Sequence, residues 1–237
     1  MRKIIGHHAI REFLKVRPRA IEKVFFKSDW EKNSDLQEQH ELIKKYTKNI
    51  DYIGVKKLDQ ECPGHQGALI YAQESPEISL QDLADKESAL VLLLDGIQDP
   101  QNIGAITRSA WLMGADVIYL PQKRSAYHSP AAHKVASGGM EHVAIEQVSQ
   151  LQDIIKELQG IGFWAYAFDQ AGEQSLYQTD LPKKTAVVLG SEEKGIKKSA
   201  LKASDQTLFI PQKDRDASYN VSVSAAIAMA EYSRQHS

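Results

Sequence analysis

The first part of the chain alternates short apolar runs with amphipathic stretches, which is the pattern of a compact α/β unit. It predicts helices over His7–Lys15, Asp35–Lys45 and Lys56–Gln60, and strands over Ile21–Phe26, Ile50–Ile53 and Ala68–Ala72. From Gln73 to Ser88 the apolar content drops and Ser, Pro and acidic residues gather, which is typical of an exposed linker. We therefore expect a small domain at residues 1–75 and a linker at 76–88.

The second part opens with the apolar run Ala89–Asp95, whose lack of alternation is typical of a strand covered on both faces of a parallel sheet. Further strands are expected at Asp116–Leu120, Phe163–Phe168, Ala186–Gly190 and Thr207–Ile210, with helices at Ile103–Met113, Leu151–Gln159 and Val221–Ser233. Strands that alternate with helices predict a doubly wound parallel α/β domain over residues 89–237.

Composition narrows the class of protein. The chain has 237 residues, a formal net charge of −2 and one cysteine, Cys62, so it can form no internal disulfide and holds no thiolate pair for structural zinc. Its histidines lack the spacing of a metal site, and no metal is expected. No apolar run approaches the roughly 20 residues that cross a bilayer. We expect a cytoplasmic protein with no membrane contact.

Charge is unevenly distributed along the chain. Residues 1–27 carry eight Lys and Arg side chains against only Glu12 and Glu22. Such a local excess attracts phosphates. A solvated helix face accounts for it equally well.

In open α/β sheets, ligands bind outside the carboxyl ends of the strands. Three segments that follow predicted strands are therefore candidates: residues 95–110, 187–195 and 209–224. In the first, Asn102 is expected to cap a helix, which needs no further role. Arg108 lies among apolar residues, where a buried guanidinium would need an anionic or hydrogen-bonding partner. We take Arg108 as the functional candidate of this segment.

The other two segments offer a turn and a helix start. Gly190 and Gly195 bound a turn that carries Glu192, although a tight structural turn explains both glycines. Ser218 and Asn220 suit the start of the last helix, and their place after a strand aims them at the other two segments. Neither a dinucleotide fingerprint nor a nucleoside-triphosphate loop is present in the sequence.

At these positions the sequence resembles the SpoU group of the SPOUT methyltransferases. The three motifs of that group match Asn102–Ala110, Gly190–Gly195 and Ile210–Ser222, and the segment Lys134–His142 is also similar. Residues 5–26 resemble the ribosomal-protein-like substrate domain at the N terminus of many members. Within the group, the chain is most similar to bacterial 23S rRNA (guanosine-2′-O-)-methyltransferases.

The resemblance implies a C-terminal trefoil knot, a homodimer, S-adenosyl-L-methionine as cofactor and structured RNA, in particular 23S rRNA, as substrate. It places the cofactor at Gly190, Ile210 and Tyr219. It implies a catalytic cluster made of Asn102, Arg108, Glu192, Ser218 and Asn220. Arg108 would either activate the ribose hydroxyl as a base or clamp the target phosphate. A guanidinium stays protonated at ordinary pH and has no acceptor, which favours the clamp.

The sequence departs from the family pattern mainly in the third motif, where Gln212, Asp214 and Tyr219 replace the usual Met, Gly and Leu. In the second motif, Glu193 stands where many members have Gly. These changes bear on cofactor affinity and substrate choice. Two alternatives to rRNA methylation stay open: a tRNA 2′-O-methyltransferase, and a non-catalytic RNA-binding protein that retains the fold.

Overall fold

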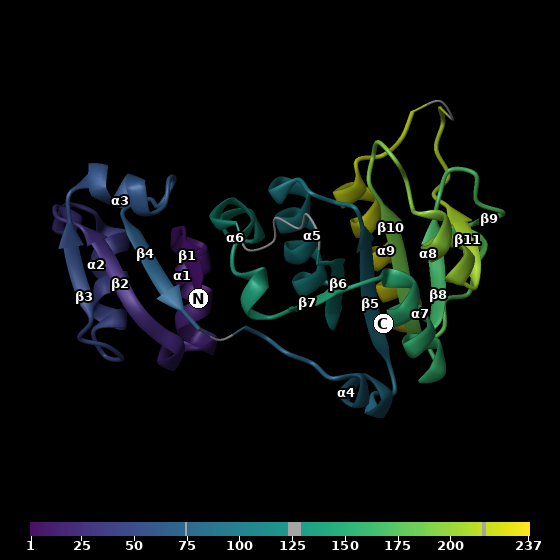
Figure 1. Cartoon of the computed structure of the whole chain (residues 1–237), viewed down its shortest axis with the longest axis horizontal. Helices are drawn as coiled ribbons and strands as arrows, with labels where there is room; N and C mark the ends of the chain where they lie inside the picture. The colour runs from purple at the N-terminus through teal and green to yellow at the C-terminus, as the bar shows by residue number, and fades with distance from the viewer. Residues whose placement is uncertain (74, 123–128, 215–216) are drawn as a thin grey trace.

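The computed structural model describes the whole chain except residues 74, 123–128 and 215–216. Two separate sheets lie side by side along its longest axis (Figure 1). We call residues 1–72 the N-terminal unit and residues 89–237 the C-terminal unit. Among the described residues, no helix has both the length and the apolar character needed to span a bilayer.

The N-terminal unit is a four-stranded sheet with helices on both faces. Its elements are β1 (Arg2–Ile5), α1 (His7–Val16), η1 (Pro18–Ala20), β2 (Ile21–Lys27), η2 (Trp30–Lys32), α2 (Ser34–Ile43), β3 (Ile50–Ile53), α3 (Val55–Glu61) and β4 (Ala68–Ala72). The strand order is β1-β4-β2-β3, and only β2 and β3 pair in parallel. Helices α1 and α2 share one apolar cluster, whereas α3 packs on the other face. All the elements predicted for this part are confirmed, and β1 is an addition.

The segment predicted as an exposed linker is partly structured. It contains helix α4 (Leu80–Asp85), which begins at a capping box formed by Ser79 and Asp82. Leu83 of this helix is fully buried and joins an apolar cluster of the C-terminal unit. The connection is therefore anchored to the second unit.

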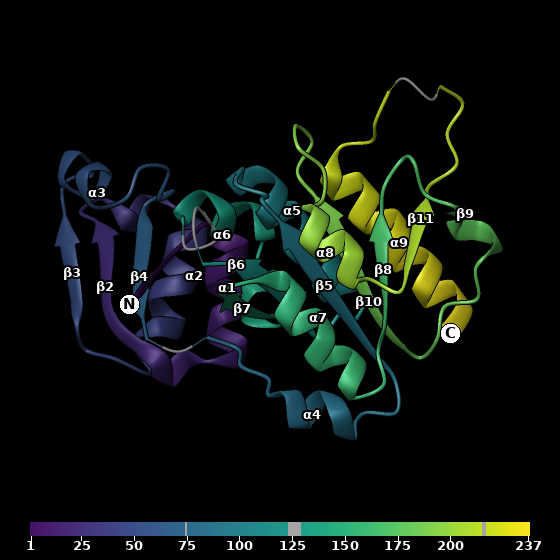
Figure 2. The same cartoon turned by 45° about the vertical axis from the view of Figure 1, so that its right-hand side comes forward.

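The C-terminal unit is a seven-stranded sheet in which every pair of neighbouring strands is parallel. Its strands are β5 (Ala89–Asp95), β6 (Val117–Pro121), β7 (Ala144–Val148), β8 (Trp164–Phe168), β9 (Gln174–Ser175), β10 (Lys184–Gly190) and β11 (Gln206–Phe209). Its helices are α5 (Pro100–Leu112), α6 (Pro130–Ala136), η3 (Gly139–Glu141), α7 (Leu151–Gly160), η4 (Leu176–Gln178), α8 (Lys198–Ala203) and α9 (Val221–His236). Figure 2 shows these helices on the two faces of the sheet.

The strand order β7-β6-β5-β10-β8-β11-β9 confirms the doubly wound parallel fold. Every residue of β5 is buried, because α5, α6 and α9 cover one face of the sheet while α4, α7 and α8 cover the other. From β5 the chain continues to β6 on one side, whereas β10 leads toward β11 on the other. The carboxyl ends of β5 and β10 meet where Asp95 pairs with Gly190, which is where such sheets bind ligands. The segment after β11 includes residues 215–216, outside the described chain, so the knot stays a prediction.

The two units meet at a junction built around Glu141 of η3. Both terminal nitrogens of the Arg2 guanidinium donate to the Glu141 carboxylate, at 2.6 and 2.7 Å, and the two side chains are only 5% and 1% exposed. Arg17 donates to the backbone carbonyl of Glu141 at 2.5 Å. A buried carboxylate is tolerated only where such partners compensate for its lost hydration.

A second part of the junction brings α1 against residues 138–142. Gly138 has a φ of +99°, and a Cβ on it would lie 2.5 Å from the Cβ of Glu12. The Glu12 carboxylate lies 3.1 Å from Nε2 of His142, whose ring stacks on Trp111 with centroids 4.4 Å apart. The segment Lys134–His142, singled out by its resemblance to the family, therefore forms much of the contact between the units.

Candidate active site

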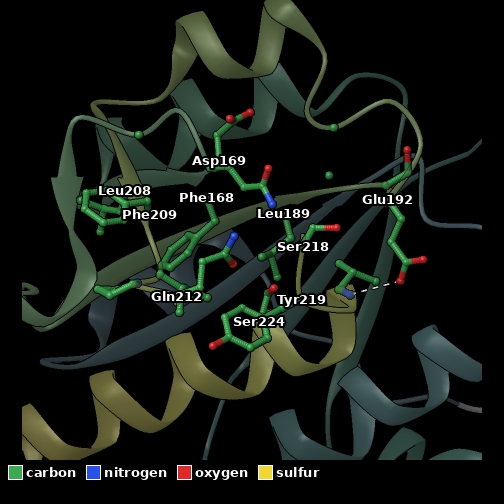
Figure 3. A pocket seen from close by; sticks show the side chains of 18 residues that line it. Phe168, Asp169, Leu189, Glu192, Leu208, Phe209, Gln212, Ser218, Tyr219 and Ser224 are labelled. Atoms are coloured by element: carbon green, nitrogen blue, oxygen red, sulfur yellow. Dashed lines mark hydrogen bonds between the residues drawn. The ribbon is translucent and has the colours of Figure 1, made fainter. Parts of the chain in front are cut away.

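A pocket of about 460 Å³ opens at the carboxyl ends of β8, β10 and β11 (Figure 3). Its lining comprises Phe168, Asp169, Gln170, Gly172, Leu189, Gly190, Ser191, Glu192, Gly195, Leu208, Phe209, Ile210, Pro211, Gln212, Ser218, Tyr219, Val221 and Ser224. Three strand ends and the start of α9 thus contribute to one cavity. This is the edge of the sheet at which the sequence predicts the site.

The chemistry of the lining favours a ligand that is not an anion. Apolar side chains such as Phe168 and Leu189 supply surface for a flat or aliphatic group. Asp169 and Glu192 supply carboxylates, and the lining contains no Lys or Arg among the residues that the structure describes. A phosphate-bearing ligand would find no charge partner in this lining, whereas a cation would.

The turn after β10 depends on two glycines. Gly195 has a φ of +62°, and its amide donates to the carbonyl of Ser191 at 2.8 Å. A Cβ on Gly190 would lie 2.1 Å from the carbonyl carbon of Gly195, so no other residue fits under this turn. The turn carries Glu192, which lines the pocket and reaches toward the start of α9 (Figure 3).

Asn220 connects the three candidate segments. Its Nδ2 donates to Oδ1 of Asn102 at 3.0 Å and to Oε1 of Glu192 at 2.7 Å. Its Oδ1 accepts from the amide of Ser222 at 2.9 Å, which makes Asn220 the cap of α9. Oε1 of Glu192 also accepts a hydrogen bond from the backbone amide of Val221 at 3.4 Å (Figure 3). One amide side chain therefore caps a helix and orients a carboxylate and a second amide at the pocket.

Gln212 has a role that its departure from the family pattern did not suggest. Its Nε2 donates to the carbonyl of Ala217 at 2.5 Å, and Nε2 of Gln170 donates to the same oxygen at 2.6 Å. The two amides fasten the segment that carries Ser218 and Tyr219 to the ends of β8 and β11. Both side chains line the pocket, so they could exchange this contact for one to a ligand.

The structure brings together most of the residues predicted for the site. Gly190, Glu192, Ile210, Ser218 and Tyr219 all line the pocket. Asn102 and Asn220 join it through the hydrogen bonds described above. The predicted start of the last helix is confirmed, with Asn220 as its cap.

Two expectations for the first segment are wrong. Asn102 does not cap α5; Asp99 does, accepting from the amide of Gln101 at 2.9 Å, and Pro100 occupies the first turn. Arg108 is not buried. The buried face of α5 is made by Ile103, Gly104, Ile106, Thr107 and Ala110.

Arg108 points away from that buried face and is exposed. Its Nη1 contacts Oγ of Ser137 at 3.4 Å, close to the junction with the N-terminal unit. It does not line the pocket of its own chain. Apolar neighbours in sequence are consequently no guide to the burial of a side chain on the opposite side of a helix.

The sequence reasoning missed the residues that end β8. Phe168 is the last residue of a strand that was predicted, Asp169 and Gln170 directly follow it, and all three line the pocket. The rule that ligands bind at the carboxyl ends of strands would have identified them. Among the described residues no group of His, Cys, Asp or Glu is arranged to hold a metal ion. Cys62 is the only cysteine of the chain, and burial raises the pKa of its thiol.

The fold and the pocket define a doubly wound α/β protein with a ligand site at the carboxyl ends of β8, β10 and β11. Residues 89–230 match the sequence model of a family described as "SpoU rRNA Methylase family". Residues 3–77 match a second family model, described as "RNA 2′-O ribose methyltransferase substrate binding". The chain belongs to the SpoU rRNA methylase family.

Relatives that align over nearly their whole length agree with this assignment, and a solved structure shares the fold. The chain is 33% identical to the 23S rRNA (guanosine-2′-O-)-methyltransferase RlmB of Neisseria meningitidis, over 99% of this chain and 95% of the relative. It is 31% identical to the protein of the same name in Haemophilus influenzae, over 98% and 97%. The SpoU methyltransferase AviRb of Streptomyces viridochromogenes, solved with AdoMet, shares the fold with a TM-score of 0.85 at 18% identity, over 99% of this chain and 89% of that one.

Proposed function

We propose that the chain transfers the methyl group of S-adenosylmethionine to the 2′-hydroxyl of a guanosine in 23S rRNA. The observation that carries the proposal is the hydrogen-bonded cluster of Asn102, Glu192 and Asn220, which joins three distant segments beside the pocket that Glu192 lines. Full-length relatives named as 23S rRNA (guanosine-2′-O-)-methyltransferases support the reaction and the substrate. The N-terminal match to a substrate-binding description supports RNA as the partner.

The residues present fit S-adenosylmethionine. This cofactor carries a positively charged sulfonium, and the described lining offers Asp169 and Glu192 and no basic side chain. Backbone groups near Gly190, Ile210 and Tyr219 would hold its neutral parts, and the apolar side chains would pack against its adenine. When bound, it supplies an electrophilic methyl group.

Each polar residue of the cluster then has a separate task. Asn220 keeps Glu192 and Asn102 in fixed orientation, which matters because in-line attack by a ribose oxygen requires precise alignment. Ser218 offers a hydroxyl at the pocket wall. Arg108 binds the phosphate beside the target ribose and stabilises negative charge on the attacking oxygen. A guanidinium cannot accept the hydroxyl proton, which passes to solvent water as the methyl group leaves the sulfonium for the oxygen.

We propose further that the enzyme is a homodimer in which Arg108 of one subunit completes the pocket of the other. Arg108 is exposed and outside the pocket of its own chain, which supports its arrival at the target phosphate from a second copy. Leu112 of α5 and Val223 of α9 are 66% and 44% exposed on two helices that cover the same face of the sheet. A second subunit would cover them.

Methyl transfer from labelled S-adenosylmethionine to 23S rRNA tests the reaction, with the modified ribose then mapped. One labelled guanosine is expected. Label found only in transfer RNA would favour the tRNA alternative. Failure of folded protein to bind the cofactor, together with RNA binding, would instead identify the non-catalytic alternative.

Mixed dimers test the contribution of the second subunit. Arg108→Ala and Asn220→Ala should each abolish most methyl transfer when pure. If the site is shared, random mixing of the two should restore about a quarter of the wild-type sites, because half of the dimers are mixed and each holds one intact site. If each chain builds its own site, mixing restores nothing.

A further inference from the structure

An aromatic stack lies on the surface of the N-terminal unit, far along the chain from the methyl-transfer pocket. The Trp30 and His40 rings stack with centroids 3.9 Å apart and planes 25° from parallel. Tyr52 lies 6.1 Å from Trp30 at 28°, and its hydroxyl is 2.6 Å from Nε2 of His40. The three rings come from η2, α2 and β3. We call them the Trp30–His40–Tyr52 stack.

The stack is more than core packing. Phe26 is fully buried and meets His40 edge-on at 5.5 Å, so it already closes the apolar core below the stack. Tyr52, in contrast, is 48% exposed, and β3 that carries it is an edge strand. Figure 1 shows β3 on the side of the N-terminal unit that faces away from the C-terminal unit. An exposed ring at this edge stabilises little by burial.

The opposite face of the same sheet shows what a closed aromatic cluster looks like. There Phe25 and Tyr71 pack edge to face at 5.9 Å. Lys23 lies over the Phe25 ring and Lys3 over the Tyr71 ring. The Tyr71 hydroxyl donates to Glu61 at 2.7 Å, so every ring already has a partner. The exposed Tyr52 ring has an open side by comparison.

The rings of the stack are held in place before any ligand binds. The bond between His40 and the Tyr52 hydroxyl fixes the Tyr52 ring, and the stacked Trp30 fixes His40. A surface with fixed rings loses little conformational entropy when a flat group stacks on it. Aromatic rings of this kind are the means by which proteins hold unpaired nucleobases.

A cationic side chain lies beside the stack in sequence. Lys32 ends η2, two positions after Trp30, whereas Lys56 and Lys57 belong to α3, which packs on the other face of the sheet. Lys32 is exposed and pairs with no carboxylate in the described part of the chain. Nearby Lys27 and Lys44, in contrast, are bound to Asp29 and Glu41. An unpaired lysine near stacked rings suits a base with its phosphate.

We propose that the Trp30–His40–Tyr52 stack binds an unpaired nucleobase of the RNA substrate, with Lys32 contacting an adjoining phosphate. The proposal rests on the proposed function in so far as it takes RNA as the ligand. It assigns the outer edge of the N-terminal unit to single-stranded RNA, separate from the ribose that is methylated.

The test is binding of a fluorescently labelled hairpin RNA with an unpaired loop to the full chain. Tyr52→Leu should weaken binding roughly 5- to 100-fold, the range expected for loss of one stacked base. Tyr46→Leu is the matched control, since Tyr46 is 49% exposed in the same unit but lies outside the stack. Tyr52→Phe keeps the ring and should bind within a few-fold of wild type.

Tryptophan fluorescence gives a second measurement, which reports on Trp30 of the stack itself. Binding of the hairpin should quench tryptophan fluorescence, and Trp30→Phe should remove most of the quenching while Trp164→Phe leaves it. Equal RNA affinity of Tyr52→Leu, Tyr46→Leu and wild type would overturn the proposal, even if the enzyme methylates 23S rRNA normally. Failure of wild type to bind unpaired RNA would also overturn it. The proposed function fails separately, by absence of cofactor binding or of methyl transfer.

Discussion

The pocket at the strand ends and the junction between the two units are both built from polar side chains, but the two regions use them differently. At the junction, the charges of Arg2 and Glu141 are withdrawn from water and neutralise each other. At the pocket, the amide of Asn220 binds neighbours that remain partly open to solvent. We infer that the junction serves mainly stability, whereas the pocket keeps groups available for a ligand.

The largest effect on stability should come from Glu141→Ala. Removing the carboxylate breaks both of its bonds to the buried Arg2 guanidinium, which should cost about 3–5 kcal/mol of unfolding free energy. Urea unfolding measures the loss, and S-adenosylmethionine affinity should hardly change. Glu38→Ala is the control, because Glu38 pairs with Arg11 on the surface with its side chain 53% exposed. Similar small losses for both variants would show that the junction carries little stability.

The next effect concerns the close approach at Gly138. Gly138→Ala places a Cβ 2.5 Å from Glu12 and adds strain at a positive φ. Gly114→Ala is matched, since Gly114 has a φ of +75° but nothing within 4 Å. Strain alone should cost about 1–2 kcal/mol in each variant, with a further loss only at Gly138. Equal melting temperatures of the two variants would mean that α1 moves aside freely.

Substitutions at two helix caps distinguish an effect on stability from an effect on ligand binding. Asn220 caps α9, and Asn33 caps α2, where its side chain accepts from the amide of Leu36 at 3.1 Å. Replacing either by Ala should cost about 0.5–2 kcal/mol of unfolding free energy. Only Asn220→Ala should also weaken S-adenosylmethionine binding in calorimetry. Unchanged cofactor affinity would reduce Asn220 to a structural residue.

The smallest effect should be a dependence on pH at the junction. Burial raises the pKa of Glu12. Hydrogen bonds from Lys15 and His142 lower this pKa by more than burial raises it, so the net pKa lies below the usual 4.5. Its contribution to stability is therefore present above pH 4.5 and is lost as the pH falls below it. Urea midpoints of wild type and Glu12→Gln should differ at pH 7 and converge near pH 3. A constant difference would contradict this account.

Much of the fold could be predicted from the sequence, because buried parallel strands have continuous apolar runs. The run Ala89–Asp95 is β5, and its pairing with β10 brings Gly190 to the predicted edge. Strands β1, β7 and β9 were not predicted. The polar pair Glu146–Gln147 interrupts the apolar run of β7, and β9 has only two residues. The pairing of β1 with β4 depends on contacts distant in sequence.

The candidate site was predicted in part for the same reason. Residues at strand ends converge because the sheet places them, so Glu192 and Asn220 were found correctly as neighbours. The position of Arg108 depends on the rotation of α5 about its axis, which apolar neighbours in sequence do not reveal. The junction partners Arg2 and Glu141 are 139 positions apart, and no local pattern links them.

The insertion of β10 beside β5 has a consequence for folding during synthesis. The sheet of the N-terminal unit has all its strands once Ala72 has been made. β5, at the centre of the second sheet, pairs residue for residue with β10, which follows 95 positions later (184 − 89). At about 5–20 residues per second, the ribosome needs roughly 5–20 s to supply that strand. During this interval β5 lacks its permanent neighbour on one side and can pair only with β6 on the other.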